Sequence, residues 1–518
     1  MTQQGGEGFT RRNLMQYAGA LAGSAAVYSI AGALGAVPSF ANAQPLQLDA
    51  SRRPCKVLIL GAGMAGLISA YELEKAGYEV QIVEASHRIG GRSLTLRHGD
   101  LIDEIGNKRY CQFDNDPGLY FNAGPARIPS EHSNILGYCK ELGVQLEPFI
   151  NSNRAAWMQF DNFNNGQRMR QQQFVAESRG FISEIVSKGV SNGWLDQPLN
   201  NLDKDRLQEF LSRFGDLSAD GQYLGSNRSG YASGGLLTPG IIKPKVPFEE
   251  LLASDFWRLG MNFGEAAPMA SVMQAVGGMD TIVRTLAEKV RGTITLNAPV
   301  VSVKTVSDGV TVTWREGGGL RTETADYCLN SIPGQLLSGI DNNFPDEFVA
   351  KIKARRRGKL SKVGLQMSSR FWEEEGVYGG ISWTGADITQ IMYPSGGFGS
   401  PKGVLVGAYI FSPVLNDQFM AMTSEERIQM ALTQGEKLHP GYSKYFESGA
   451  SVAWYRMNHM LGCTATEIDD STATSLRQPR GNHYLIGDQV AHHSGWQESA
   501  VLTAHEALNS IQAREAAR

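Results

Sequence analysis

The sequence has little excess charge of either sign and few cysteines. Its 48 lysines and arginines nearly balance its 52 aspartates and glutamates, which gives a net charge of −4. Proteins that coat nucleic acids carry a strong basic excess, so this balance excludes a nucleic-acid partner of that kind. The five cysteines include no CxxC pair, which excludes both a disulfide scaffold and a zinc-finger array.

Long apolar runs are absent after residue 43, so we expect no stable membrane anchor in the rest of the chain. Hydrophobic residues make up 42% and charged residues 19% of the sequence, which excludes wholesale disorder. A chain of 518 residues has room for roughly two to four domains. Its 59 glycines exceed the usual share of about 7% and favour tight turns and backbone close to a ligand.

Residues 1–43 have the pattern of an export signal. A twin-arginine start, TRRNL at 10–14, precedes an uncharged apolar run at 18–37 and a small-residue cleavage site, ANA at 41–43. A transmembrane anchor is the alternative, since the run is about long enough to span a bilayer. Because the run is rich in glycine and alanine, we expect export by the twin-arginine route and a soluble periplasmic or secreted protein that starts at Gln44.

The next segment has the pattern of a dinucleotide-binding unit. A strand at 56–60 is followed by GAGMAGL at 61–67, a helix to Lys75, and a second strand at 80–83 that ends in Glu84. Strand, glycine turn, helix, strand and acid all stand in the required order, which makes a chance glycine-rich turn a poor alternative. The sequence therefore predicts a Rossmann-like fold.

Each glycine of this motif, and the acid that follows it, has a physical role in binding a dinucleotide. Gly61 allows the tight turn, Gly63 lets the backbone approach a pyrophosphate, and Gly66 lets the helix pack on the strand. The helix N-terminus faces the phosphates. Glu84 binds ribose hydroxyls, and an acid there disfavours NADP.

The segment EASHRIGGRS at 84–93 decides between NAD and FAD. Two glycines stand between arginines, so backbone and guanidinium groups can both approach a phosphate. This segment resembles that of flavin-dependent amine oxidases, which implies FAD as the cofactor.

GPARIP at 124–129 resembles the segment of L-amino-acid oxidases that passes under the flavin and presents an arginine to the substrate carboxylate. Arg127 is the matching residue. A planar guanidinium binds a carboxylate through two parallel hydrogen bonds. A structural surface arginine is the alternative.

Three further matches carry the same resemblance. Val300, in the expected strand at 293–306, matches the residue whose backbone meets the adenine. Lys362, in the strand-like segment 361–373, matches a lysine that holds a water near the reactive flavin nitrogen; an outward-facing strand lysine is the alternative. Tyr393, in IMYPSGG at 391–397, matches a tyrosine that helps bind the substrate carboxylate, with a structural core tyrosine as the alternative.

The C-terminal segment 483–508 reads as strand, loop and closing helix. Asp488 holds the acidic position that binds the flavin ribityl chain. The turn at 495–500 resembles the one that directs backbone amides at the flavin, and Trp496 walls the pocket. LGCTAT around Cys463 lacks the Ser-Gly-Gly-Cys-Tyr run of enzymes that bind flavin covalently, so we expect non-covalent FAD. We expect no metal site at the adjacent His492 and His493.

The resemblance thus implies a full set of site residues. The catalytic residues are Lys362 and Arg127, and the substrate-binding residues are Arg127, Tyr393, Gly495 and Trp496. The cofactor-binding residues are Gly61, Gly63, Met64, Ala65, Gly66, Glu84, Ala85, Arg92, Gly124, Pro125, Ala126, Arg127, Val300, Asp488, Gly495, Trp496, Gln497 and Ala500.

The expected fold is α/β, with a Rossmann-like FAD-binding domain of the GR2 type, a mixed-sheet substrate domain and a helical insertion. The FAD-binding domain comprises 44–125, 270–334 and 451–518; the substrate domain comprises 126–150 and 335–450; the helical domain comprises 151–269, with helices near 172–189 and 203–213. The arginine run at 355–357 is expected to be a solvated face. The resemblance also implies a homodimer or higher homo-oligomer.

The expected activity is FAD-dependent oxidation of L-amino acids by O₂ to 2-oxo acids, ammonia and hydrogen peroxide, broad for bulky side chains. An amino-acid 2-monooxygenase is the first alternative, because both classes keep the arginine. A primary-amine or polyamine oxidase is the second, and a non-catalytic FAD-carrying interaction protein is the third.

Overall fold

The computed structural model describes residues 46–194, 199–254, 271–466 and 468–518. The export signal expected at 1–43 lies outside this part of the chain. Among the described residues, no helix is both long enough and apolar enough to cross a membrane.

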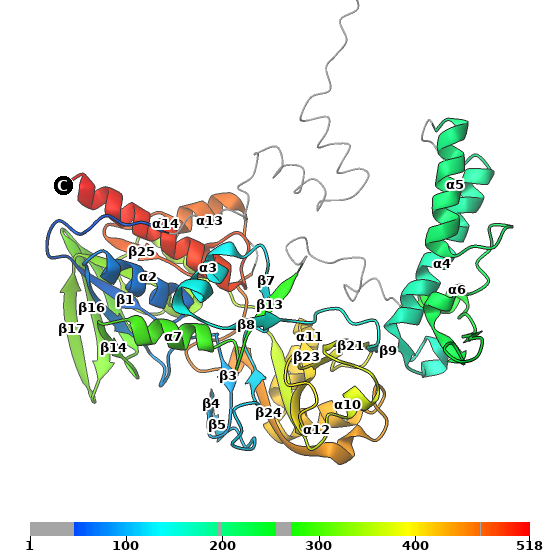
Figure 1. The fold of residues 1–518 in the computed structure, drawn as a ribbon. Helices are drawn as coiled ribbons and strands as arrows, with labels where there is room; N and C mark the ends of the chain where they lie inside the picture. Colours follow the sequence, from blue (N-terminus) through cyan, green and yellow to red (C-terminus); the bar gives the residue numbers. More distant parts are fainter. Residues whose placement is uncertain (1–45, 195–198, 255–270, 467) are drawn as a thin grey trace, which may run out of the picture.

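A five-stranded parallel sheet forms the centre of the first domain, in the order β14-β2-β1-β18-β25. Its strands are β1 (Lys56–Leu60), β2 (Glu79–Val83), β14 (Thr293–Thr295), β18 (Tyr327–Asn330) and β25 (His483–Leu485). Three segments that are far apart in the sequence therefore meet in one sheet (Figure 1). This arrangement confirms the expected α/β fold.

Both faces of this sheet are covered, as a parallel sheet requires. Val57 and Ile59 pack with the helices α2 (Met64–Lys75), α3 (Ser133–Leu142), α7 (Thr281–Lys289) and α14 (Gln497–Ala516). Leu58 and Leu60 point the other way and pack with Trp314 in a four-stranded sheet. That sheet comprises β15 (Val300–Val306), β16 (Gly309–Glu316), β17 (Gly319–Ala325) and β19 (Asp341–Asn342).

The second domain is built on a mixed seven-stranded sheet in the order β10-β9-β21-β22-β23-β20-β24. Its strands are β9 (Trp157–Gln159), β10 (Met169–Arg170), β20 (Ser361–Met367), β21 (Gly380–Thr384), β22 (Gln390–Tyr393), β23 (Gly403–Ile410) and β24 (Phe446–Ala453). Helices α10 (Phe371–Glu374), α11 (Pro413–Ala421) and α12 (Ser424–Gly435) pack with this sheet. Helices α8 (Gly334–Leu337), α9 (Asp346–Ala354) and α13 (Asp470–Arg477) pack instead with Leu58 and Leu60 of the first domain. Two of the strands, β9 and β10, lie at the start of the range 151–269 that we expected to form the helical domain.

The helical segment follows β10 directly. It comprises α4 (Gln171–Ser191), α5 (Asn201–Gly215) and α6 (Phe248–Ala253), with a small ribbon of β11 (Tyr231–Ser233) and β12 (Ile241–Ile242). The first two helices agree closely with those expected from the sequence. Figure 1 shows this segment projecting away from the two large sheets.

Short strands join the domains. They are β3 (Thr95–Leu96) with β6 (Phe121–Asn122), β4 (Leu101–Glu104) with β5 (Asn107–Tyr110), and β7 (Ile128–Pro129) and β8 (Leu146–Pro148) on either side of β13 (Val272–Ala275). Farther along the chain, the single strand expected at 293–306 is divided between two sheets. Asn297, at φ 54°, and Pro299 break it, because neither conformation continues a strand.

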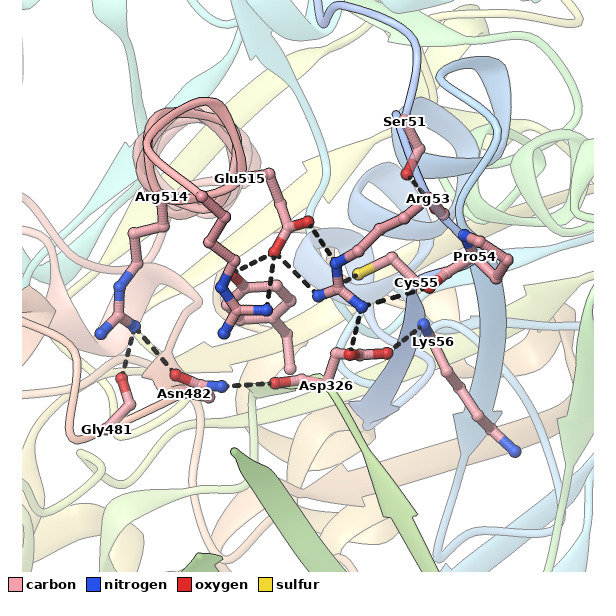
Figure 2. A network of polar contacts seen from close by, with 12 residues as sticks. Ser51, Arg53, Pro54, Cys55, Lys56, Asp326, Gly481, Asn482, Arg514 and Glu515 are labelled. Atoms are coloured by element: carbon pink, nitrogen blue, oxygen red, sulfur yellow. Dashed lines mark hydrogen bonds and ion pairs between the residues drawn. The ribbon is translucent and has the colours of Figure 1, made fainter. Parts of the chain in front are cut away.

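Both ends of the described chain are joined by a polar network at the edge of the first domain (Figure 2). The guanidinium of Arg53 donates to Asp326 at 2.7 Å and to Glu515, in the last turn of α14, at 2.8 and 2.9 Å. Asp326 also accepts from the backbone N–H of Lys56 at 2.8 Å. The start of β1, the start of β18 and the end of α14 are therefore held at one point.

Candidate functional site

A cavity of about 710 Å³ lies where the carboxyl ends of β1, β2 and β18 face the second domain. Ligands bind at this end of open parallel sheets, and the volume falls within the range of about 300–1,000 Å³ for small-molecule sites. Of the residues expected to bind the cofactor, all except Gly66 line it: Gly61, Gly63, Met64, Ala65, Glu84, Ala85, Arg92, Gly124, Pro125, Ala126, Arg127, Val300, Asp488, Gly495, Trp496, Gln497 and Ala500.

The glycine loop between β1 and α2 fits a dinucleotide. Gly61 has φ 104°, a conformation that side chains rarely adopt. A Cβ on Gly63 would meet nothing within 4 Å, so the bare backbone borders open space. A Cβ on Gly66 would lie 2.1 Å from the carbonyl oxygen of Gly61, which confirms that this glycine permits helix and strand to pack. The N-terminus of α2 opens onto the cavity and suits phosphate.

Glu84 closes the glycine loop at the end of β2. Its carboxylate accepts from the backbone N–H of Ala62 and of Ser86, each at 2.7 Å. Burial raises the pKa of Glu84 and these two hydrogen bonds oppose the rise. The carboxylate therefore already fixes the loop, and its expected contact with the ribose stays a prediction.

Arg92 and Asp488 form an ion pair inside the cavity. The Arg92 guanidinium donates to both carboxylate oxygens, one at 2.9 Å, and the backbone N–H of Gly495 adds a third donor at 2.9 Å. Burial alone would raise the pKa of Asp488, but the charge and hydrogen bonds of Arg92 hold it far below its usual range. Arg92 is thus ion-paired with Asp488, and its expected contact with a cofactor phosphate stays a prediction.

Arg127 is a cation at the cavity wall that forms no ion pair with the described residues. Arg127 lies between β6 and β7 and lines the cavity. The Cζ atom of its guanidinium lies 5.8 Å from the ring centroid of Phe149. Its Nε is buried without a hydrogen-bond partner, and no carboxylate of the described residues pairs with it. Burial lowers its pKa. An unpaired buried charge is costly, so this geometry suits the arrival of an anion.

Lys362 lies against the backbone of the segment that leads to Arg127. Its Nζ donates to the carbonyl oxygens of Asn122 at 3.1 Å and Gly124 at 2.6 Å, and lies 4.3 Å from the ring centroid of Tyr409. Every residue of β20 is buried, so the alternative of an outward-facing lysine is wrong. Burial, together with a smaller effect of the charge of Arg127, lowers the pKa of Lys362 to about 7.

The structure corrects the expected role of Tyr393 in binding the substrate carboxylate. Its hydroxyl donates to Ser382 at 2.6 Å and shares a 2.5 Å hydrogen bond with His439, within the hydrophobic core of the second domain. Successive strand residues point to opposite faces, so the preceding residue, Met392, packs toward the cavity side with Phe149. The structure therefore places Tyr393 away from the cavity, as the core alternative describes.

The sequence did not point to several of the residues that line the cavity, among them Tyr409, Arg357 and His132. Tyr409 on β23 takes the place expected for Tyr393. Arg357 is buried and lines the cavity, donating to the carbonyl oxygen of Cys463 at 3.3 Å. His132 packs edge-on against Trp496 with ring centroids 4.8 Å apart, and burial lowers its pKa to about 4. None of the three belongs to a recognisable motif.

The arginine run at 355–357 also needs correction. Arg355 and Arg357 are 2% and 6% exposed, and Arg356 alone faces solvent. Arg355 donates to the carbonyl oxygen of Gln489 at 2.7 Å, so its burial comes from a contact that is distant in sequence. The run is not a solvated face.

The cavity wall also contains a free thiol. Cys463 lines the cavity as an unpaired cysteine, and burial raises its pKa. The described part of the chain holds no group of three or more side chains suited to a metal.

Comparison with known proteins agrees with this geometry. The family model for flavin containing amine oxidoreductases matches residues 64–510. An L-amino-acid oxidase from Siganus canaliculatus is 28% identical over 480 residues, 88% of this chain and 85% of the relative. An L-amino-acid oxidase from Mus musculus is 27% identical over 478 residues, 88% of this chain and 70% of the relative.

Solved structures show the same fold. Putrescine oxidase bound to putrescine aligns with a TM-score of 0.60 at 20% identity, covering 89% of this chain and all of that one (100%). Cyclohexylamine oxidase from Brevibacterium oxydans IH-35A aligns with a TM-score of 0.60 at 19% identity, covering 90% and 100%. With the glycine loop, the Arg92–Asp488 pair and the family match in agreement, the chain belongs to the flavin-containing amine oxidoreductases and is a flavoprotein oxidase.

Proposed function

We propose that this protein oxidises L-amino acids with O₂ and water to 2-oxo acids, ammonia and hydrogen peroxide, using non-covalently bound FAD. The observation that carries the proposal is the half-buried guanidinium of Arg127 at the cavity wall, whose buried Nε has no hydrogen-bond partner. A substrate carboxylate would satisfy that charge, whereas a simple amine would leave it unpaired. The names of the curated relatives support the same substrate class.

The chain's residues divide the work of positioning. Arg127 binds the carboxylate and fixes the α-carbon, while the rings of Tyr409 and Trp496 exclude water. Flavin, when bound in this cavity, would supply an acceptor for the hydride of the α-carbon and a route for its electrons to O₂. The N-terminus of α14, at Gln497, points backbone N–H groups into the cavity and stabilises negative charge there.

Lys362 is suited to handle a proton beside this site. With its pKa near 7, its ammonium can release a proton or regain one within the physiological range. The carbonyl oxygens of Asn122 and Gly124 hold the Nζ in place. Most of the acceleration would come from orientation of the bound substrate.

The apolar cluster next to Arg127 supports a preference for bulky side chains. Phe149, which lies against the guanidinium, packs with Ile381 and Met392. We further propose export through the twin-arginine signal of residues 1–43 and a homodimeric or higher assembly, both of which rest on the sequence and the resemblance.

The test is peroxide release by the purified yellow protein with each of the twenty L-amino acids, with D-isomers and simple amines as controls. Peroxide with stoichiometric 2-oxo acid from L-isomers alone is the expected result. Amide and carbon dioxide with little peroxide would assign a 2-monooxygenase instead. Activity on amines alone would refute the role of Arg127, and silence on every substrate would favour the non-catalytic alternative.

A further inference from the structure

We propose a second binding site, for a dianionic oxyanion such as a phosphate group, where the seven-stranded sheet meets the helical segment. A cavity of about 300 Å³ opens there between the β9–β10 pair and residues 243–250. It shares no lining residue with the cofactor cavity. It is therefore a separate site, and the proposal does not depend on the oxidase activity.

The first wall of this cavity presents two guanidinium groups on one indole ring. β10 runs antiparallel to β9, which places Arg170 opposite Trp157. The Cζ atoms of Arg168 and Arg170 lie 3.9 and 3.5 Å from the indole centroid. The indole Nε1 donates to Glu375 at 2.6 Å, so the ring is itself fixed. Stacking on a fixed ring holds the planar donors in place.

The second wall adds two lysines from residues 243–250. Lys245 donates to the carbonyl oxygen of Tyr223 at 2.8 Å, and the side-chain amide of Gln173 holds the carbonyl oxygen of Pro244 at 3.2 Å. Both walls are thus anchored, one to the sheet and one to the helical segment. An anion between them would bridge the two.

Positive charge exceeds negative charge around this cavity. Its lining contains Arg168, Arg170, Lys243 and Lys245 but only one carboxylate, Glu250, among the described residues. The Glu250 carboxylate already accepts from the backbone N–H of Asn164 at 3.0 Å. Glu375, outside the lining, pairs with Arg168, so a net positive charge remains, and net positive charge in a concave site attracts anions.

Donor groups remain free to bind such an anion. Arg168 uses its Nη1 to bind Glu375 at 2.9 and 3.1 Å, while its Nε and Nη2 have no hydrogen-bond partner among the described residues. The same is true of Nζ of Lys243. Guanidinium forks match phosphate geometry, and about 300 Å³ is the lower end of the size range for small-molecule sites. The chemistry therefore fits a small phosphate or phosphate monoester.

The test is calorimetric titration of the FAD-loaded protein with inorganic phosphate at constant ionic strength. Lys243→Glu reverses a charge in the cavity, and Lys204→Glu makes the same change at an exposed site on α5. We expect saturable binding at one site per chain in the wild type and in Lys204→Glu, and at least tenfold weaker binding in Lys243→Glu. Because the Lys243 ammonium has no partner among the described residues, its replacement should leave the fold intact.

A thermal melt in phosphate provides a second readout, since a ligand that binds only the folded state raises Tm. Phosphate should raise the Tm of the wild type and of Lys204→Glu more than that of Lys243→Glu. Titration with glycerol 3-phosphate identifies the source: tighter binding than phosphate indicates a phosphorylated small molecule, and equal or weaker binding indicates the free anion. Equal weakening in both variants, or heat that never saturates, would overturn the proposal.

Discussion

Replacement of Arg127 by methionine should affect substrate binding and stability in opposite directions. In the free protein the guanidinium is half-buried with its buried Nε unpartnered, and burial lowers its pKa. Methionine fills similar space without a charge, so the free energy of unfolding should stay unchanged or rise. A structural arginine would behave differently, because its loss would leave hydrogen-bond acceptors unsatisfied.

The magnitude for the substrate follows from the loss of a buried, hydrogen-bonded charge partner. Removing one such partner costs about 2–5 kcal/mol, and about 1.4 kcal/mol is a factor of ten. We therefore expect kcat/KM for L-amino acids to fall by about 30- to 3,000-fold. Turnover of an amine that lacks the carboxylate should not fall.

The assay combines steady-state peroxide release, FAD content by absorbance, and chemical unfolding. Arg284→Met is the matched control, because Arg284 is exposed on α7 outside the cavity. The reasoning would be refuted if Arg127→Met unfolded more easily than the wild type while its kcat/KM for L-amino acids fell less than tenfold.

Three other changes test particular contacts. Tyr393→Phe should lower stability by about 1–3 kcal/mol through unsatisfied buried partners yet leave KM unchanged, as measured by urea unfolding and kinetics. Below pH 7, Lys362→Met should have a larger free energy of unfolding than the wild type. From about pH 7 to about pH 10 the difference between the two should shrink by about 1.4 kcal/mol per pH unit. The sign follows because the native lysine loses its proton near pH 7, so the unfolded chain binds more protons in that window. Gly66→Ala should lose FAD on purification, because its Cβ would meet a backbone oxygen at 2.1 Å.

Each of these has an outcome that would contradict it. A large rise in KM for Tyr393→Phe would return that residue to the substrate site. A constant stability gap from pH 6 to pH 10 would show that Lys362 keeps an ordinary pKa. Gly137→Ala on α3 is the control for Gly66→Ala, since a Cβ there meets nothing within 4 Å and should stabilise the helix by about 0.5–1 kcal/mol. Equal FAD loss in both would refute the packing argument.

Local sequence determined the glycine loop and its flanking elements almost completely. The strand at 56–60, the helix ending at Lys75 and the acid at Glu84 lie where their pattern predicts them. Each depends on residues within one short segment, so turn chemistry and periodicity are sufficient there. The same holds for the start of α14, where Trp496 precedes the first helical turn.

Contacts between distant segments were beyond the sequence. Tyr393 and Tyr409 lie on the neighbouring strands β22 and β23, and which residue of each strand faces the cavity depends on how the sheet is assembled, because successive residues point to opposite faces. Burial of Arg355 and Arg357 depends on carbonyl oxygens more than 100 residues away in the chain. The cavity beside Trp157 likewise joins segments that carry no shared motif.

The Arg53 contacts set a condition on when the molecule can finish folding. Arg53 and Glu515 are separated by 462 positions, so a growing polypeptide can offer Arg53 only its Asp326 ion-pair partner until residue 515 has been made. Contacts of such long sequence separation form late. Docking of the last turn of α14 is therefore the final step that completes this network around Arg53. A chain that stops short of Glu515 would keep the Asp326 contact of Arg53 and lose both contacts to α14.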